Sequence, residues 1–325
     1  MELGPLLVIR ILNGIATAAV AAPAEASLVD QVPEERRGEA LGFYLTLSMI
    51  GFNMGPVFGG AIQFLSNDVF SLGLEWSYRI PFFIDSLLAF LAFLLVWRGV
   101  KETRGSSTLQ RIAQPKTNVD LSKKVKFALK VLYLSSLATG FTVGFIIPVV
   151  VLYFGDVFNA TSLQIGLILS LAGFVGLTCN LYAGRISDRV GRKPVIALGS
   201  LPSRLATIVF RFAPDLVSAA GVTIFRAFGH NVAMPASRAL NADLIPGQVR
   251  GKLLGRMAAF FSLGAIIGPV LSTWIYEAYQ FQTFQIPWLG NLTIRGVGIP
   301  FFVSSAIGLV SLFLLLAFVE EPKRR

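Results

Sequence analysis

The sequence contains little charge, one cysteine and one histidine. Only 14% of its 325 residues are charged and 54% are hydrophobic, which gives a mean hydropathy of +0.69. A water-soluble domain of this size could not bury so much apolar surface in one core. We therefore expect a polytopic membrane protein.

Several kinds of site are also absent from the sequence. The single cysteine, Cys179, cannot form an intrachain disulfide, and it lies in an apolar run where a small buried hydrophobe is its simplest role. No metal-ligand cluster, nucleotide-binding glycine-rich loop or nucleophile triad stands out. The sequence therefore indicates no enzyme, no metal and no cofactor.

Long apolar runs, in contrast, are frequent. A helix crosses about 30 Å of hydrocarbon with roughly 20 residues. Nine runs are long enough, at 5–23, 39–65, 80–98, 128–153, 163–183, 194–212, 215–237, 253–277 and 297–319. The sequence thus predicts an all-α fold with about nine transmembrane helices.

The basic residues are distributed unevenly between the loops. The formal net charge of +10 could suggest nucleic acid as a partner, but 21 of the 28 lysines and arginines lie in alternate loops and only 2 in the loops between them. This is the positive-inside pattern of an inner or plasma membrane protein. We expect the C-terminus on the cytoplasmic side and the N-terminus outside. The segments expected in the cytoplasm are 36–37, 98–126, 185–193, 238–256 and 323–325.

The sequence contains an internal repeat. Residues 30–56 and 243–269 both read D-x2-P-x3-R-G-x2-L-G-x8-G-x3-G-P without a gap. The match continues from IPFFIDS at 80–86 to IPFFVSS at 299–305. Duplicated helical units are typical of secondary transporters, whose binding site lies between the repeats.

The two copies of the repeat are preceded by unequal numbers of apolar runs. One run lies before the first copy, whereas three runs and most of a fourth lie between the basic linker and the second copy. We therefore expect residues 1–100 to form an incomplete N-terminal half with three helices, 101–126 a basic cytoplasmic linker, and 127–325 a six-helix C-terminal half. Two equal halves would hold twelve helices, so about three are expected to be missing before Met1.

Three motifs resemble signatures of the major facilitator superfamily of secondary transporters. GRISDRVGRKP at 184–194 matches the cytoplasmic loop signature G-x3-D-R-x-G-R-[RK]. RILNG at 10–14 is similar to the fourth-helix signature, with Asn13 where Gln is usual. GFNMGPVFGG at 51–60 is similar to the fifth-helix signature of drug–proton antiporters, although looser versions occur in importers. The resemblance covers the chain from the fourth of the family's twelve helices to its end, and it implies a two-half fold.

The charged loop indicates how such a transporter would close. Gly184 and Gly191 are expected to permit a tight turn, and Asp188 to face the positive N-terminal end of a helix in the other half, near Gly38. The loop cations could pair with acids of the first copy, namely Glu34, Glu35 and Glu39. This cluster would latch the cytoplasmic side shut; a turn that only fixes topology is the simpler interpretation. The latch residues would be Gly184, Asp188, Arg189, Gly191, Arg192 and Lys193.

Glycines at helical spacing mark candidate helix contacts. Residues four apart share a helix face, where small side chains let another backbone approach, and an internal proline adds a kink. Close packing alone would explain the pattern, and the resemblance adds a kink that seals the cavity. The residues concerned are Gly51, Gly55, Pro56, Gly59 and Gly60 in the first copy, and Gly264, Gly268 and Pro269 in the second.

Polar residues within the apolar runs are candidates for the cavity. An arginine at a helix centre costs about 2.5–3.5 kcal/mol on insertion scales, so it should face a cavity or a partner. Arg10 could bind substrate, take part in coupling or pair with Asp85, and Arg204 and Arg211 could snorkel or pair. His230 could titrate near neutrality or be a hydrogen-bonded structural group. The candidates are Arg10, Asn13, Asn53, Asp85, Arg226, His230 and Asn231.

Taken together, these features predict a secondary active transporter. The fifth-helix motif favours proton-coupled efflux of small amphipathic compounds by alternating access. A solute:proton symporter for uptake, or a non-transporting membrane remnant or scaffold, are the alternatives. The expected partners are a small-molecule substrate, protons and the lipid bilayer, whereas the substrate's identity and the oligomeric state are left open by the sequence.

Overall fold

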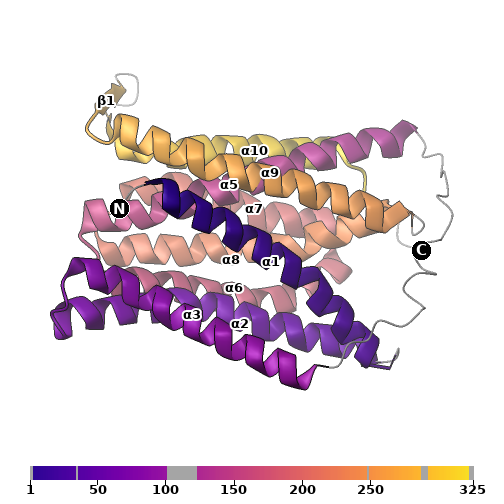
Figure 1. Cartoon of the computed structure of the whole chain (residues 1–325). Coiled ribbons are helices and arrows are strands. Elements are labelled where there is room, and N and C mark those ends of the chain that lie inside the picture. The colour runs from indigo at the N-terminus through magenta and orange to yellow at the C-terminus, as the bar shows by residue number, and fades with distance from the viewer. Residues whose placement is uncertain (1–2, 34–35, 101–122, 247–248, 287–291, 322–325) are drawn as a thin grey trace. The chain divides into compact units, whose positions relative to one another are not determined.

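A computed structural model describes the chain apart from residues 1–2, 34–35, 101–122, 247–248, 287–291 and 322–325 (Figure 1). In this part of the chain each predicted apolar run corresponds to one long helix, although several helices extend six to eight residues beyond the run at one end. The helices are α1 (Leu3–Gln31), α2 (Arg37–Phe64), α3 (Leu74–Gly99), α5 (Lys123–Phe158), α6 (Ser162–Val190), α7 (Arg192–Val209), α8 (Leu216–Leu244), α9 (Arg250–Tyr279) and α10 (Ile299–Phe318).

Seven of the helices in the described ranges are long and apolar enough to cross a membrane. The two others are α1 and α8. Apolar residues in α1 form only the shorter stretch Val8–Thr17, and α8 carries Arg226, His230 and Arg238 along its length. The all-α polytopic fold is confirmed. The basic residues of α8 explain why it falls below the hydropathy of the other helices of the bundle.

Local sequence signals explain where the helices begin. Thr161 and Gln164 form a capping box at the start of α6, with hydrogen bonds of 2.8 and 3.3 Å. Asp215 and Ser218 form another at the start of α8, where the Asp215 carboxylate accepts the Ser218 backbone N–H at 2.7 Å. Each box satisfies backbone N–H groups that the first helical turn leaves without a partner.

The internal repeat has the same backbone turn in both copies. The carbonyl of Pro33 accepts the N–H of Arg36 at 3.0 Å between α1 and α2, and the carbonyl of Pro246 accepts the N–H of Val249 at 3.1 Å between α8 and α9. A proline disfavours helix in the residue before it, so the preceding helix ends at the same repeat position each time. The duplicated sequence therefore encodes a duplicated helix-turn-helix.

The described structure contains one short β-sheet that the hydropathy pattern did not predict. Strands β1 (Thr283–Ile286) and β2 (Leu292–Arg295) pair antiparallel, with Thr283 opposite Arg295 and Ile286 opposite Leu292. They form a hairpin between α9 and α10. We call the end of the bundle that bears this hairpin the hairpin end, and the end that bears Gly191 the charged end.

The chain divides into two compact units. The first comprises Met1–Phe52 and Tyr78–Lys116, and the second comprises Asn53–Ser77 and Thr117–Arg325. The first unit thus holds α1, the first part of α2 and most of α3. The second part of α2 belongs to the second unit because it packs on α6. The expected boundaries at 100 and 126 stay a prediction. Most of the expected linker lies outside the described residues, and its last residues begin α5.

Contacts between backbones hold the second part of α2 against α6. The N–H of Val57 donates to Ser170 Oγ at 3.1 Å. Gly60 is buried with its Cα against the backbone of Ser162, so that a Cβ atom there would overlap it. Gly166 stands in the same relation to the Pro56 carbonyl. Small residues on both helices therefore permit this close crossing.

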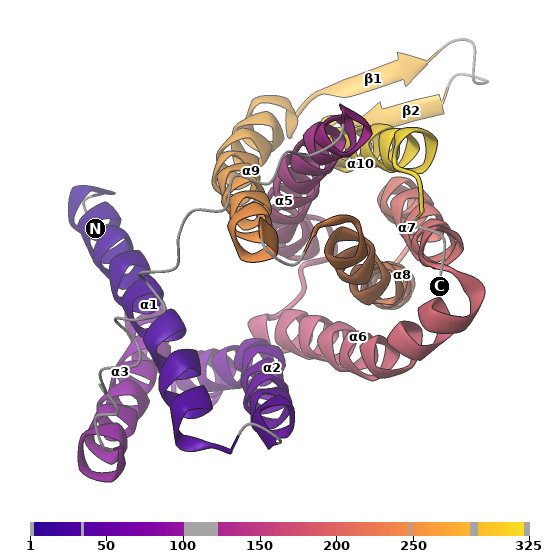
Figure 2. The ribbon, with the colours of Figure 1, turned by 90° about the vertical axis from the view of Figure 1, so that its right-hand side faces the viewer.

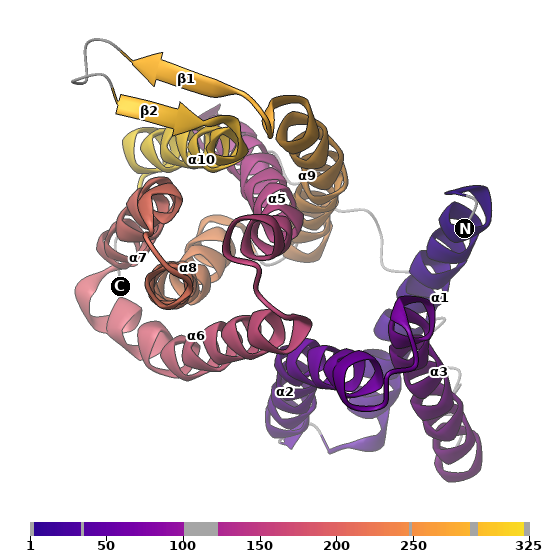
Figure 3. The same ribbon diagram turned by 90° about the vertical axis from the view of Figure 1, so that its left-hand side faces the viewer.

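Helices α5 to α10 form a six-helix bundle in the second unit (Figures 2 and 3). Helix α5 packs on α9 and α10, and α8 packs on α6 and α7. At the charged end the core consists of aliphatic side chains that are at most 2% exposed, among them Leu132, Ile196, Leu240, Ile245 and Val319. At the hairpin end it is aromatic, with ring centroids 5.3 Å apart for Tyr153 and Phe210 and 4.7 Å apart for Phe210 and Phe301.

Candidate functional site

The charged stretch 184–194 is helical over most of its length. Helix α6 continues to Val190, so Gly184 lies inside the helix and our expectation that it forms part of a turn is wrong. Gly191 alone makes the turn to α7, with φ +118°, a value that strongly favours glycine. The carbonyl of Gly184 instead accepts a hydrogen bond of 2.8 Å from Ser187 Oγ. The last two turns of α6 therefore present their charges in a fixed helical order.

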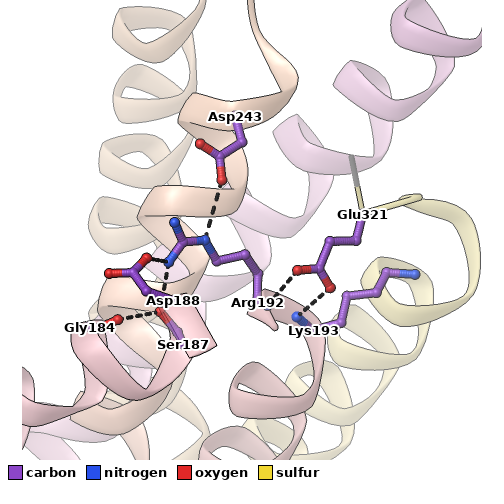
Figure 4. Close-up of polar contacts among 7 residues, drawn as sticks. All are labelled: Gly184, Ser187, Asp188, Arg192, Lys193, Asp243 and Glu321. Atoms are coloured by element: carbon purple, nitrogen blue, oxygen red, sulfur yellow. Dashed lines mark hydrogen bonds and ion pairs between the residues drawn. The ribbon is translucent and has the colours of Figure 1, made fainter. Parts of the chain in front are cut away.

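Arg192 joins the ends of three helices (Figure 4). Its Nη1 donates to Ser187 Oγ at 2.8 Å and forms an ion pair with Asp188, both on α6. Its Nε lies 3.3 Å from Asp243 Oδ2, near the end of α8. The Arg192 side chain is only 16% exposed, so its charge is held between two carboxylates rather than in solvent. We call these residues, together with Glu321, the Arg192 cluster.

Glu321, which follows α10, caps the start of α7 (Figure 4). Its Oε1 accepts the backbone N–H of Arg192 at 2.6 Å, and its Oε2 accepts that of Lys193 at 3.3 Å. Gly191 has no side chain to fill this role. A carboxylate at this position satisfies two free N–H groups and complements the helix dipole. Lys193 Nζ adds a hydrogen bond of 2.8 Å to the carbonyl of Leu316, so α7 and α10 are tied together.

The contacts of the charged stretch that the structure describes lie within the second unit. Asp188 pairs with Arg192. Arg189 is exposed. In the first unit Glu39 forms an exposed ion pair of 3.0 Å with Arg36, and residues 34–35 lie outside the described part of the chain. The latch between two halves therefore stays a prediction.

Sequence reasoning missed Ser187, Asp243 and Glu321 as members of this cluster. Asp243 is the first residue of the repeat, and Glu321 closes a V-x-E pattern that ends both copies, at Val100 and at Val319. Both positions carried a signal in the repeat. What the sequence could not provide was the pairing with Arg192, which depends on how the helix ends meet.

A second polar group lies deeper in the bundle, on α7 and α8. Ser203 Oγ on α7 donates to the carbonyl of Arg226 on α8 at 2.8 Å, and Ser305 Oγ on α10 donates to the carbonyl of Arg204 at 2.7 Å. The Arg204 guanidinium lies against Gly308, where a Cβ atom would overlap it. Arg226 and His230 lie one helical turn apart on α8, the helix that packs on α7 with Arg204.

The asparagine candidates of the second unit take part in helix contacts. Asn231 Oδ1 on α8 accepts from Asn180 Nδ2 on α6 at 3.0 Å, and Asn231 Nδ2 donates to the carbonyl of Ala227 at 2.9 Å. Asn53 lies against Gly173 of α6. Asn180 was not singled out from the sequence, because a lone amide in an apolar run does not reveal its partner. These contacts give both asparagines a packing role, and a role in a cavity stays a prediction.

The candidates of the first unit are exposed on its helices. The side chains of Arg10 and Asn13 on α1 and of Asp85 on α3 are all exposed. The carbonyl of Asn13 accepts a hydrogen bond of 2.9 Å from Thr17 Oγ. Among the described residues no ion pair joins Arg10 to Asp85. The proposed roles of these residues in coupling stay predictions.

The glycine candidates have two different environments. A Cβ atom on Gly264 or Gly268 of α9 would overlap the backbone of α5, where Gly140 and Gly144 make reciprocal contacts with α9 and the Cδ of Pro269 lies beside Gly144. In the first copy Gly60 has such a contact, whereas Gly51, Gly55 and Gly59 have open space beside them in the described structure. The duplicated glycines are therefore not used in the same way in the two copies.

The described residues contain no group of three His, Cys, Asp or Glu side chains that could hold a metal ion.

A sequence profile described as Major Facilitator Superfamily matches residues 3–135 and 132–325. Multidrug resistance protein MdtG of Salmonella typhimurium is 25% identical over 263 residues, which are 80% of this chain and 62% of that protein. Multi-drug resistance efflux pump PmrA of Streptococcus pneumoniae is 27% identical over 270 residues, which are 82% of this chain and 64% of that protein. The chain thus spans less than two thirds of the length of these relatives.

Two solved transporter structures are similar to the fold described above. The D-xylose-proton symporter superposes with a TM-score of 0.70 and 19% identity, covering 98% of this chain and 72% of the symporter. A bacterial homolog to the human lysosomal transporter Spinster, in an inward-facing and occupied conformation, gives a TM-score of 0.68 and 18% identity, covering 91% and 72%. At these identities the likeness concerns the fold alone.

The apolar helices, the six-helix bundle and the duplicated helix-turn-helix define an integral membrane protein with the fold of secondary transporters. The profile match extends over nearly all of the sequence, and the charged stretch between α6 and α7 agrees with it. The chain belongs to the Major Facilitator Superfamily, a family of transporters rather than enzymes.

Proposed function

We propose that the chain forms part of a secondary active transporter that exports small amphipathic compounds in exchange for protons. The observation that carries the proposal is the Arg192 cluster at the charged end. Its contacts are hydrogen bonds and ion pairs. The side chains of Asp188 and Asp243 in this cluster are 61% and 48% exposed. Ion pairs of this kind contribute little net stability, so they can be exchanged when helix ends separate, as alternating access requires.

Export is favoured over uptake by the two bacterial relatives, whose names describe multidrug resistance and efflux. The motif at 51–60 supports the same direction. The likeness to the xylose symporter concerns the fold and gives no direction. Symport for uptake and a non-transporting remnant or scaffold are the alternatives against which export is tested.

In this proposal the protein lies in the inner or plasma membrane with its charged end and C-terminus in the cytoplasm. Residues 1–100 and 127–325 contribute to the two halves, and the linker 101–126 joins them. The substrate, protons and the bilayer are the partners. The positive-inside distribution of lysine and arginine supports this orientation.

The test uses everted membrane vesicles from cells that express the full chain. Respiration acidifies the interior of such vesicles, so a proton-coupled exporter should accumulate a fluorescent amphipathic compound inside them. Nigericin, which collapses the pH gradient, should release it. One cationic and one anionic compound are used in parallel, with vesicles from cells carrying an empty vector as the control. Proton-driven loss of preloaded compound would instead indicate symport, and equality with the control would indicate a protein that does not transport.

A further inference from the structure

We propose that Arg204, Arg226 and His230 form a site for an anionic group, so that the compound exported by this protein carries a negative charge. This inference rests on the proposed export function and names the chemical class of its substrate. It starts from the position of the three side chains within the second unit.

Arg204 and Arg226 lie far from both ends of their helices. With a rise of about 1.5 Å per residue, Arg204 is roughly 18 Å from the charged end of α7, and Arg226 is roughly 15 Å from the hairpin end of α8. Both helices are part of the apolar bundle, so these positions fall within the hydrocarbon region of the membrane. His230 follows Arg226 by one helical turn and lies on the same face of α8.

Close helix contacts bring these side chains into one space. The backbones of α7 and α8 approach at Gly199 and Gly229, where a Cβ atom on either would overlap the other. One turn away Ser203 Oγ donates to the carbonyl of Arg226. On the third side Gly308 of α10 leaves room for the Arg204 guanidinium. These contacts place the Arg204 guanidinium beside α10, and the backbone of Arg226 directly opposite Ser203 of α7.

Neither guanidinium group has a partner in the part of the chain that the structure describes. The hydrogen bonds at Arg204 and Arg226 involve their backbone carbonyls, and neither side chain makes a hydrogen bond or an ion pair to a described residue. The His230 ring has none either. The next charged side chain along α8 is Arg238, about two turns beyond His230 and a further cation. All three residues are partly buried and retain some accessible surface.

The carboxylates of the second unit are elsewhere. Each described one lies in a loop or within a few residues of a helix end, and several already have partners: Asp156 accepts from Tyr276, Asp215 caps α8, and the Arg192 cluster uses three others. Those that the structure describes are Asp68, Glu75, Asp156, Asp188, Asp215, Asp243, Glu277, Glu320 and Glu321. The unit therefore places positive charge in its interior and negative charge at its ends.

An arginine pair without a carboxylate attracts an anion. Arginine stays protonated in proteins, so the two cations cannot avoid repulsion by losing a proton. A guanidinium presents paired N–H groups that match the two oxygens of a carboxylate, phosphonate or sulfonate. An anion bound between the two side chains would satisfy both arginines at once, and water-free surroundings would strengthen its hydrogen bonds.

The test compares two fluorescent compounds that differ only in one charge. These are N-dansyl-6-aminohexanoic acid and its methyl ester, titrated into the full chain purified in detergent. The acid should bind at least about tenfold more tightly than the ester, as expected for hydrogen bonds to charged groups. Arg204→Gln and Arg226→Gln should each remove most of that difference. Arg295→Gln, at an exposed position on the hairpin, is the matched control and should leave it unchanged.

A third variant separates binding from folding. Arg226→Lys retains the positive charge and should retain part of the preference for the acid, with a thermal midpoint close to that of Arg226→Gln. Equal binding of acid and ester by the unchanged protein would overturn the proposal. The same holds if the Gln and Lys variants lose both compounds equally, because the arginine would then be structural.

A competition experiment with chloride tests whether the site binds an organic or an inorganic anion. Chloride that competes with the acid supports a shared anion site, whereas chloride binding without any binding of the acid would assign the site to an inorganic ion and overturn the proposal.

The vesicle experiment separates the test of the anion site from the test of export. Binding of the acid without transport of either compound would contradict export and leave the anion site standing. Export of the cationic compound alone, unaffected by Arg226→Gln, would contradict the anion site and leave export standing.

Discussion

The carboxylate of Glu321 accepts the backbone N–H of Arg192 at 2.6 Å, although the two residues are 129 positions apart in the sequence. Gly191 precedes α7 and has no side chain. The free backbone N–H groups in the first turn of α7 therefore lack a side-chain acceptor at the N-cap position. The segment after α10 supplies the missing acceptor and ties two helices of the bundle together at the charged end.

We expect Glu321→Gln to lower the stability of the protein in detergent. The variant loses the negative charge at the start of α7 and weakens two backbone hydrogen bonds, a loss of about 0.5–2 kcal/mol by comparison with other helix caps. The measurement is the thermal midpoint. Glu320→Gln is the matched control, because Glu320 is exposed one residue earlier. Equal shifts in the two variants would contradict the cap.

The pair of Arg192 and Asp243 should show energetic coupling. Because the Arg192 side chain is 16% and that of Asp243 48% exposed, the ion pair is partly screened and should contribute about 0.5–1 kcal/mol. A double-mutant cycle with Arg192→Gln and Asp243→Asn, followed by unfolding in SDS, measures this coupling. Additive effects of the two substitutions would show that the contact has no energetic role.

Asp188→Asn should reach the membrane in normal amounts but transport poorly. The substitution removes one of the two carboxylates that hold Arg192 while it preserves the shape of the side chain. The readout is dye accumulation in everted vesicles, normalised to the amount of protein. Glu277→Gln, at the opposite end of the bundle, serves as the control. Transport by Asp188→Asn at the level of the unchanged protein would exclude the latch.

Gly264→Ala should disrupt the crossing of α5 and α9. A Cβ atom at this position would meet the backbone of Leu137 and Phe141, which cannot move aside as a flexible side chain could. We expect a loss of roughly 1–3 kcal/mol, as for other overpacked contacts, measured as a lower thermal midpoint. Gly255→Ala on the same helix has open space beside it and should be neutral or slightly stabilising because alanine favours helix. A neutral Gly264→Ala would show that the crossing is looser than described.

The cap of α8 should respond to acid. Asp215 accepts the backbone N–H of Ser218, which lowers the pKa of its carboxyl below the ordinary value of 3.8. A carboxyl whose pKa is depressed on folding stabilises the fold at pH values above 3.8, and this contribution is lost as the pH falls through the lower folded-state pKa. Protection of the amides in the first turn of α8, measured relative to their intrinsic exchange rate at each pH, should therefore fall below about pH 4. Asp215→Asn keeps a capping oxygen and should remove this pH dependence; an unchanged profile would rule out Asp215 as its origin.

Much of the fold was predictable because membrane helices are recognised in a sequence by their length and hydropathy. Hydropathy does not show where a helix continues into water, however, and so the charged turns of α6 up to Val190 were mistaken for a loop. The hairpin of β1 and β2 was missed because two strands of four residues carry too weak a signal next to long apolar runs.

The candidate sites were predictable to different degrees. The motif at 184–194 identified Asp188 and Arg192 from the sequence, since their chemistry and spacing are distinctive. Their partners Asp243 and Glu321 required the packed bundle, because nothing local relates residue 192 to residue 321. Among the equivalent glycines of the repeat, Gly264 has a backbone against it, whereas Gly51 has open space beside it among the residues that the structure describes. Sequence equivalence therefore indicates the same helix position without deciding the same contact.

The order of synthesis gives the Glu321 cap a further consequence. A ribosome releases the start of α7 well before it reaches the glutamate 129 residues later. During that interval α7 must enter the membrane with two backbone N–H groups open to water or lipid headgroups. Capture of these groups by Glu321 can take place only after α10 has been inserted, which makes this hydrogen bond one of the last events in the assembly of the bundle.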